Sequence, residues 1–251
     1  MKTPTSALRR KSGLHNTEAS VSKARQYRRK AEQVAEKSQS PRAKNPLQAS
    51  VPHLVDQFDR VVIIGGAGTG KTWSAMSAVW QRIAAGKCDR VIISRPTVAA
   101  DDEELGFLPG TADEKMAPWL MPYQDVLINI VGDRKTAESV MKTFEVMPLA
   151  VVRGRNFLDG TCAVIDEIQN MSVSLLTAVL TRGCTGSKSI LCGDPFQCDR
   201  PGGGGHIIDM ADELKAEGAA GVVEFTDDLI IRSPDIIRVN RAMAKVKMKW
   251  G

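Results

Sequence analysis

The chain has 251 residues, of which 43% are hydrophobic and 25% are charged, and its formal net charge is +5. This is an ordinary soluble composition, with enough length for one sizeable domain and an appendage. No apolar run approaches the ~20 residues of a membrane span, and the N-terminal sequence MKTPTSALRRKSG lacks the apolar stretch of a secretory signal. These features exclude a membrane role from our expectations.

The positive charge is concentrated at the N-terminus. Residues 1–50 contain 12 lysines and arginines against 3 acidic residues, so the remainder of the chain is acidic overall. We expect a marginal helix over Asn16–Lys37, because its apolar stripe is thin, and a linker over Ser38–Pro46. The predicted organisation is therefore a basic arm over 1–46 and a folded domain over 47–251. Such arms often bind nucleic acid through phosphate contacts, and a solvated tail is the alternative.

Beyond the arm, short apolar runs alternate with helical or irregular segments. Near-continuous apolar runs are typical of strands that are buried on both faces, and their alternation with helices predicts an α/β fold with a parallel sheet covered on both sides. Asp101–Thr143 is less regular, and we expect an insertion of loop and short helices there. The predicted strands are Val61–Ile64, Val91–Ser94, Leu149–Val152, Ala163–Ile165, Ile190–Cys192 and Val222–Phe225.

A glycine-rich segment follows the first of these strands. It has the spacing G-x-x-x-x-G-K-T of a phosphate-binding P-loop, or Walker A motif. Glycines allow positive φ angles and a close approach to a phosphate, and a helix predicted over Trp73–Ala85 would turn its positive end toward the anion. The alternative is an ordinary strand-to-helix turn, which the strand, loop and helix context disfavours. The predicted nucleotide-binding residues are Gly65, Gly66, Ala67, Gly68, Thr69, Gly70, Lys71 and Thr72.

Each polar residue of this loop has an expected role. Lys71 would bridge the β- and γ-phosphates of ATP, and the Thr72 hydroxyl would be a ligand of Mg²⁺.

Two adjacent carboxylates end a later strand, in the sequence TCAVIDEIQN over Thr161–Asn170. This is a Walker B pattern, in which Asp166 would hold Mg²⁺ and Glu167 would polarise the attacking water as general base. An acidic turn that caps the following helix is the alternative.

A third buried strand leads into GDPFQ in the segment Ser189–Gln197. Ligands of α/β sheets lie at the carboxyl ends of strands, so this motif should meet the other two. Gln197 could then contact the γ-phosphate or the attacking water. A plain Gly-Asp-Pro turn is the competing interpretation.

The five cysteines form no C-x-x-C pair, and no histidine lies at metal-ligand spacing beside Cys198. We expect buried free thiols at Cys88, Cys162 and Cys192, no zinc site, and a reducing cytoplasmic location.

Seven short motifs follow one another along the chain. In order they are GGAGTGKT, SRP (Ser94–Pro96), LGFLPG (Leu105–Gly110), RGR (Arg153–Arg155), DEIQN, GDPFQ and DDLIIRSP (Asp227–Pro234). Together they resemble the motifs of PhoH-like ATPases, which are similar to the N-terminal RecA-like domain of superfamily 1 helicases. The resemblance covers about Leu47–Arg241. Gly66 stands where a proline is common in that family, and Ile168 stands where an alanine is common.

The resemblance implies further roles. Gln48 lies where such proteins place a glutamine that reads adenine, and Gln197 corresponds to the γ-phosphate sensor. Arg232 resembles a late family arginine near the phosphates. Arg153 and Arg155 match a paired-arginine segment without a defined role. Surface ion pairs are the alternative for these two residues, for Arg232 and for Arg182.

The length leaves room for one RecA-like unit, whereas a helicase motor works with two. We therefore expect a homo-oligomeric ring, a hexamer by family likeness, in which Arg182 or Arg232 is donated in trans. The leading hypothesis is an Mg²⁺-dependent ATPase that acts on RNA or single-stranded DNA. An ATP-gated assembly or binding switch is the first alternative, and a small-molecule P-loop kinase is the second.

Overall fold

The computed structural model describes residues 42–96, 112–152 and 154–226, together with residues 235, 238, 239, 242, 243, 245 and 246. The predicted basic arm, the LGFLPG motif, Arg153 and the segment Asp227–Pro234 lie outside the described residues.

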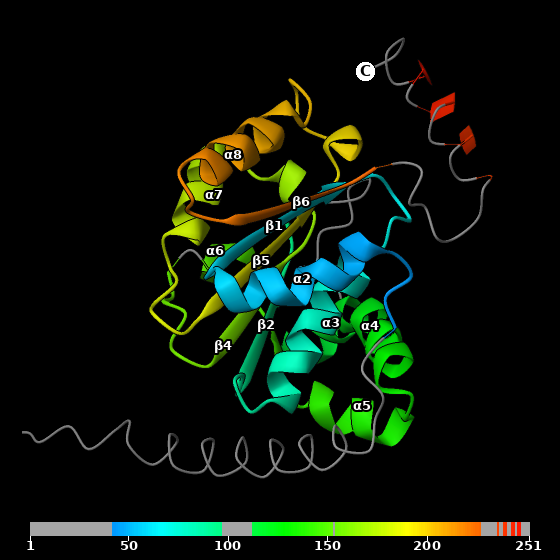
Figure 1. Ribbon diagram of the computed structural model, residues 1–251, viewed down its shortest axis with the longest axis vertical. Coiled ribbons are helices and arrows are strands. Elements are labelled where there is room, and N and C mark those ends of the chain that lie inside the picture. Colours follow the sequence, from blue (N-terminus) through cyan, green and yellow to red (C-terminus); the bar gives the residue numbers. More distant parts are fainter. Residues whose placement is uncertain are drawn as a thin grey trace, which may run out of the picture.

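The described chain is built on a six-stranded parallel sheet (Figure 1). All pairings between neighbouring strands are parallel, which confirms the predicted α/β architecture. The strands, in spatial order, are β3 (Phe144–Val146), β2 (Arg90–Ser94), β4 (Thr161–Ile165), β5 (Lys188–Gly193), β1 (Arg60–Gly65) and β6 (Gly221–Phe225).

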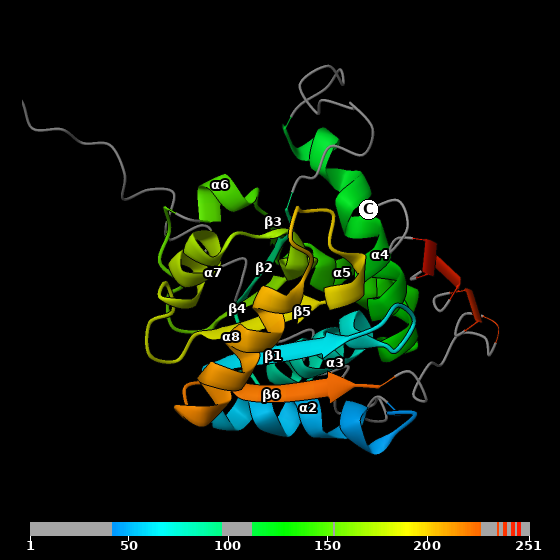
Figure 2. The ribbon, with the colours of Figure 1, turned by 90° about the horizontal axis from the view of Figure 1, so that it is seen from above.

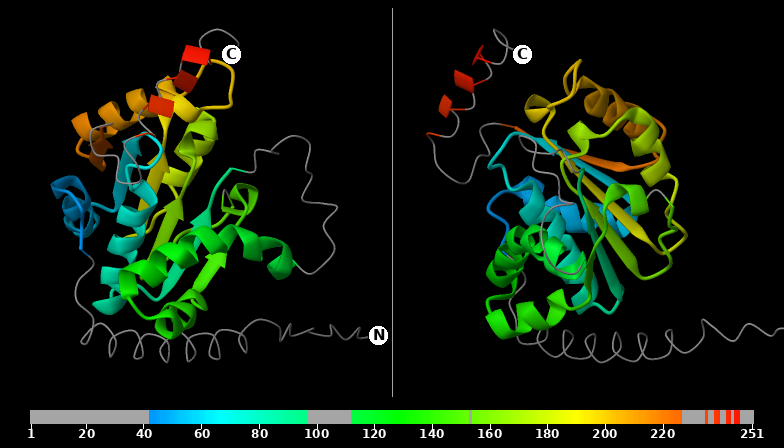
Figure 3. Two further views of the ribbon diagram at one scale, coloured as in Figure 1. Left: turned by 90° about the vertical axis from the view of Figure 1, so that its right-hand side faces the viewer. Right: turned by 180° about the vertical axis from the view of Figure 1, so that it is seen from behind.

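Helices cover both faces of this sheet (Figures 1 and 2). The view from behind shows the same division, with the sheet between two groups of helices (Figure 3). One face is covered by α2 (Pro46–Gln57), α3 (Lys71–Ala84), α4 (Ala112–Val131) and α5 (Arg134–Met141). The other is covered by α6 (Leu149–Val152), α7 (Val173–Leu180) and α8 (Gly205–Ala216).

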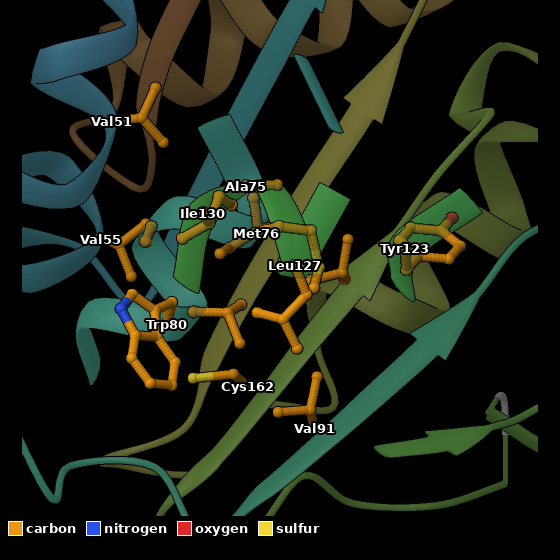
Figure 4. Close-up of a cluster of buried hydrophobic side chains, with 14 of the residues drawn as sticks. Val51, Val55, Ala75, Met76, Trp80, Val91, Tyr123, Leu127, Ile130 and Cys162 are labelled. Carbon is orange, nitrogen blue, oxygen red and sulfur yellow. The ribbon is translucent and has the colours of Figure 1, made fainter. Parts of the chain in front are cut away.

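Two hydrophobic clusters therefore form the core, one on each face. Successive residues of a strand point to opposite faces, and β1 shows this directly: Val61 and Ile63 join the first cluster, while Val62 and Ile64 join the second. The first cluster is the larger, and its helices contribute Trp80 from α3 and Leu127 from α4 (Figure 4). Burial on both faces explains why β1, β4 and β5 read as continuous apolar runs.

One predicted strand is wrong. Leu149–Val152 forms the short helix α6 instead. Pro148 precedes it and lacks an N–H for a ladder, while its carbonyl oxygen accepts hydrogen bonds from the amides of Val151 and Val152. The sheet edge is formed by Phe144–Val146, a three-residue strand with a glutamate at its centre that pairs with β2. A short apolar run does not by itself distinguish helix from strand.

The prediction of loop and short helices over Asp101–Thr143 is also wrong in the part that the structure describes. α4 is 20 residues long, and α5 begins at Arg134, where the Asp133 side chain accepts a hydrogen bond from the Thr136 amide. Both helices pack on the first cluster of the core, so they belong to the connection from β2 to β3. Pro118 and Pro122 lie within α4, although a proline inside a helix usually interrupts it.

In the described part of the chain, no helix combines the length and apolar character needed to cross a bilayer. The predicted buried thiols are confirmed: Cys88, Cys162 and Cys192 are free and buried.

Candidate nucleotide-binding site

The P-loop connects β1 directly to α3. The backbone of Gly68 has φ 81° and that of Gly70 has φ 93°, conformations that glycine adopts without steric cost. Gly70 precedes α3 and provides no side chain to cap it. The first amides of this 14-residue helix therefore remain available to an anion, as expected of a phosphate site.

Side chains of the loop stabilise this conformation. The buried Thr69 hydroxyl donates to the Gly66 carbonyl oxygen over 2.8 Å. The Lys71 ammonium donates to the carbonyl oxygens of Gly65 and Gly66 over 2.7 and 3.0 Å. The Lys71 side chain therefore lies against the same loop that would bind the phosphates.

Walker A and Walker B meet through one hydrogen bond. The Thr72 hydroxyl donates to Asp166 Oδ2 over 3.2 Å, across 94 positions of sequence. Thr72 lies in the first turn of α3, and Asp166 follows β4 directly. The two residues predicted to hold Mg²⁺ therefore lie side by side at the carboxyl edge of the sheet.

Tyr123, on α4, also reaches this carboxylate. Its buried hydroxyl donates to the same Oδ2 of Asp166 over 3.2 Å. Burial raises the pKa of Tyr123, and the Asp166 charge raises it further, so the phenol remains a neutral donor.

The electrostatic surroundings of Asp166 are mixed. Burial raises the pKa of its carboxyl group, and the neighbouring Glu167 charge acts in the same direction. Hydrogen bonds from the Glu167 amide and the Tyr123 hydroxyl lower this pKa, as does the Lys71 charge. When a buried carboxylate lies beside another carboxylate, a nearby cation stabilises its charged form. The oxygen atoms of Asp166 and Thr72 are also suitable ligands for Mg²⁺, which is usually held by one or two carboxylates together with phosphate and water oxygens.

Glu167 adopts an unusual backbone conformation. Its φ of 58° and ψ of 37° place it in the left-handed region, and among the described residues no other non-glycine has a positive φ. Its amide donates to Asp166 Oδ1 over 3.0 Å, and its carboxylate accepts a 2.6 Å hydrogen bond from Gln169 Nε2. Strained backbone of this kind persists only where surrounding contacts hold it, and such positions cluster at functional sites.

The GDPFQ segment joins the same edge, because β5 lies between β4 and β1. A 3-10 helix, η3, spans Pro195–Gln197 and begins where the Asp194 carboxylate accepts a hydrogen bond from the Phe196 amide. Gln197 is exposed. Gly193 has no room for a side chain, since a Cβ would lie 2.6 Å from Ile168 Cγ1. Close packing on Ile168 thus brings the ends of β4 and β5 together.

Gln48 lies against the P-loop and is only 2% exposed. Its Nε2 donates to the Thr69 carbonyl oxygen over 3.4 Å, and its Oε1 accepts from the Lys44 amide over 2.8 Å. Asn45 caps the first turn of α2 by accepting from the Gln48 amide. Gln48 therefore lies beside the loop, and both ends of its carboxamide form hydrogen bonds with backbone groups.

The candidate arginines do not gather at this edge within the described residues. Arg155 forms an ion pair with Glu145, whose carboxylate also pairs with Arg90. Arg182 lies near the amino ends of the strands, opposite the P-loop. Its carbonyl oxygen accepts a hydrogen bond from the Phe157 amide, and the nearby Leu180 carbonyl oxygen accepts one from Arg60, at the start of β1. Arg232 and Arg153 are outside the described residues.

Two site residues carried no assigned role in the sequence analysis, namely Tyr123 and Gln169. A buried tyrosine requires a partner for its hydroxyl, and a glutamine two positions after the Walker B glutamate is within reach of it. The tyrosine signal does not identify its partner, because Asp166 and Tyr123 are 43 positions apart. Arg95, of the SRP motif, lies with its guanidinium carbon 4.8 Å from the ring centre of Trp119, one helical turn before Tyr123.

Two solved structures resemble the fold at low sequence identity. The large terminase of a thermophilic bacteriophage matches 80% of this chain and 50% of its own, with a TM-score of 0.48 and 13% identity. The Bacteroides Pif1 bound to ssDNA matches 81% of this chain and 46% of its own, with a TM-score of 0.41 and 16% identity.

Sequence relatives are closer. A PhoH-like protein of Bacillus subtilis (strain 168) is 35% identical over 212 residues, which are 83% of this chain and 66% of that protein. A PhoH-like protein of Synechocystis is 40% identical over 161 residues, 64% of this chain and 48% of that protein. Protein PhoH of Escherichia coli (strain K12) is 31% identical over 195 residues, 76% of this chain and 54% of that protein. The chain thus spans about half to two thirds of the length of these relatives.

The family model of the PhoH-like protein matches residues 41–244. This range contains the P-loop, both acidic residues of Walker B and the GDPFQ motif. Because this match covers most of the sequence, the chain belongs to the PhoH-like protein family.

Proposed function

We propose that this chain is an Mg²⁺-dependent ATPase that couples ATP hydrolysis to RNA or single-stranded DNA. The observation that carries the proposal is the 3.2 Å hydrogen bond between Thr72 and Asp166, which joins Walker A to Walker B beside the Glu167 carboxylate. A plain turn at either motif does not require this meeting.

Thr72 and Asp166 would hold Mg²⁺, which would neutralise charge on the β- and γ-phosphates. Amides at the start of α3 would bind phosphate oxygens, and Lys71 would exchange its carbonyl partners for the β- and γ-phosphates. This assigns nucleotide binding to Gly65–Thr72, with Gln48 as the proposed contact to adenine.

Glu167 is the proposed general base. Its carboxylate accepts a hydrogen bond from Gln169, and its amide donates to Asp166. This carboxylate would accept a proton from a water placed beside the γ-phosphate. Gln197, on the adjacent strand end, would contact the γ-phosphate or this water and so report the state of the nucleotide.

The remaining charge at the transition state calls for an arginine. Arg182 lies at the opposite edge of the sheet from its own P-loop, so it could act only on a neighbouring copy. Arg232 is the other candidate. A homo-oligomeric ring, with a hexamer favoured by family likeness, would supply either residue in trans.

Support for a nucleic-acid partner is the basic composition of the N-terminal arm. Lysine and arginine side chains bind the phosphate backbone without regard to sequence, and such binding weakens as salt is raised. The cytoplasmic location predicted from cysteine usage accords with this partner.

The deciding experiment measures ATP hydrolysis by the full chain with Mg²⁺, in the absence and presence of single-stranded RNA or DNA, alongside the particle mass with and without nucleotide. We expect hydrolysis that nucleic acid accelerates. Slow hydrolysis that nucleic acid leaves unchanged, with a nucleotide-dependent change in mass, would establish the switch instead. Failure to hydrolyse ATP under all conditions would refute the proposal.

A further inference from the structure

Gln169 occupies a fully buried position between the Walker B and GDPFQ segments, with 0% of its surface exposed. Its Oε1 accepts the Asp194 amide over 3.0 Å. Its Nε2 donates to Glu167 Oε2 over 2.6 Å and lies 3.5 Å from the Gln197 carbonyl oxygen. Since an amide N–H can only donate and a carbonyl or carboxylate oxygen can only accept, these partners fix the orientation of the Gln169 carboxamide.

Neighbouring contacts make the two segments one hydrogen-bonded unit. The backbone carbonyl oxygen of Gln169 accepts a hydrogen bond from Cys198 Sγ over 3.1 Å. Asn170 exchanges two hydrogen bonds with Asp199, accepting from its amide over 2.9 Å and donating to its carboxylate over 3.1 Å. A displacement of residues 194–199 would therefore also move residues 169 and 170.

The contact to Glu167 is the functional end of this unit. Glu167 is held in a left-handed conformation that an L-residue rarely adopts, and Gln169 provides the described hydrogen bond to its carboxylate. At the other end, the Gln197 side chain is exposed and accessible to a ligand, while its carbonyl oxygen faces Gln169.

We propose that Gln169 is a positioning residue that orients the Glu167 carboxylate and couples it to the Gln197 segment. A phosphate contact at Gln197 would shift η3, and the Gln169 carboxamide would carry that shift to the proposed general base. The alignment of the base for proton abstraction would then depend on the γ-phosphate contact at Gln197. This inference rests on the proposed ATPase function and adds a residue and a coupling to it.

Two variants separate orientation from simple packing. Gln169→Glu keeps an acceptor for the Asp194 amide but loses the donor to Glu167 and places a like charge beside it. Gln169→Met keeps the length and removes both polar contacts. Gln81→Glu, at an exposed position on α3, is the matched control.

We expect kcat for ATP hydrolysis to fall by roughly 10²-fold in both Gln169 variants, as small misplacements of catalytic groups do. KM and the affinity for a non-hydrolysable ATP analogue should remain within about twofold of the wild-type values, because neither variant alters a phosphate contact. The Gln81→Glu control should retain wild-type kcat and KM.

Hydrogen exchange provides a readout that does not depend on turnover. In the wild-type chain, the ATP analogue should protect amides of both segments, 194–199 and 167–171. In the variants, protection should persist at 194–199 and disappear at 167–171.

Three results would overturn the inference. These are variants with kcat within about twofold of the wild type, variants that lose kcat and analogue binding in parallel, and wild-type protection confined to 194–199. The third applies even if both variants fail to fold. A wild-type chain that does not hydrolyse ATP would refute the proposed function, whereas hydrolysis with any of these three results would refute the role of Gln169 alone.

Discussion

The hydroxyl of Tyr123 donates to Asp166 Oδ2 over 3.2 Å, and so joins the α4 helix to the carboxylate that also accepts from Thr72. This contact makes the orientation of the Walker B carboxylate dependent on the connection between β2 and β3. Partners of metal-binding carboxylates commonly change metal affinity by about 10–100-fold when they are removed.

Tyr123→Phe should therefore raise the Mg²⁺ concentration needed for half-maximal ATP hydrolysis by about 10-fold or more. The aromatic ring is retained, so the core around Leu127 should stay packed and the melting temperature should change little. A titration of hydrolysis against Mg²⁺ at saturating ATP measures this effect. An unchanged Mg²⁺ requirement would mean that the hydrogen bonds from the Thr72 hydroxyl and the Glu167 amide are enough to orient Asp166.

Lys71→Ala should remove the thermal stabilisation that Mg-ATP gives the wild-type chain. A ligand at 100 times its Kd stabilises a folded protein by about 2.7 kcal/mol, and the loss of the phosphate contact should abolish most of this. Thermal melting with and without Mg-ATP is the measurement. Lys135→Ala, at an exposed position of α5, should keep the full ligand-induced shift. Equal shifts in the wild type and Lys71→Ala would place the nucleotide elsewhere.

Glu167→Gln should keep ATP binding and lose hydrolysis by roughly 10²–10⁴-fold, the usual contribution of a general base. The glutamine oxygen can still accept from Gln169 Nε2, so the local backbone should be preserved. Rapid-quench measurement of hydrolysis, paired with analogue binding, separates these two properties. Turnover near the wild-type rate would transfer the role of base to another residue.

Gly193→Ala should destabilise the fold by about 1–3 kcal/mol, the typical cost of overpacking. The added methyl group would lie 2.6 Å from Ile168 Cγ1 and 2.8 Å from Ile207 Cδ1. Urea unfolding measures this cost in the wild-type and Ile168→Ala backgrounds. The cost should be smaller when Ile168 is truncated, and strict additivity would show that Ile168 is not the residue that excludes the methyl group.

Removal of residues 1–41 should weaken binding to single-stranded nucleic acid and flatten its dependence on salt, since each lost phosphate contact reduces the salt slope by about one. The deletion stops there because Lys44 and Asn45 form hydrogen bonds with Gln48 at the start of α2. Binding isotherms at several salt concentrations test the arm. Identical slopes for the two proteins would identify it as a solvated tail.

The amino-acid sequence by itself determined the parallel α/β class and the P-loop. Val61–Ile64 is buried on both faces and is followed by glycines with the required spacing, and both signals are local. The same holds for Asp166 and Glu167 at the end of β4. Local pattern failed at Leu149–Val152, because a four-residue apolar run carries no period and Pro148 decided in favour of a helix.

Only the tertiary structure decided which side chains meet at the sheet edge. Tyr123 reaches Asp166, and Gln169 joins Glu167 to the segment after β5, through contacts that depend on strand order and on the packing of Ile168 against Gly193. Sequence spacing cannot encode these contacts, since they join residues from separate elements whose distance is set by the sheet. The glycine-rich loop is local in origin, whereas the alignment of the groups around it is a property of the whole fold.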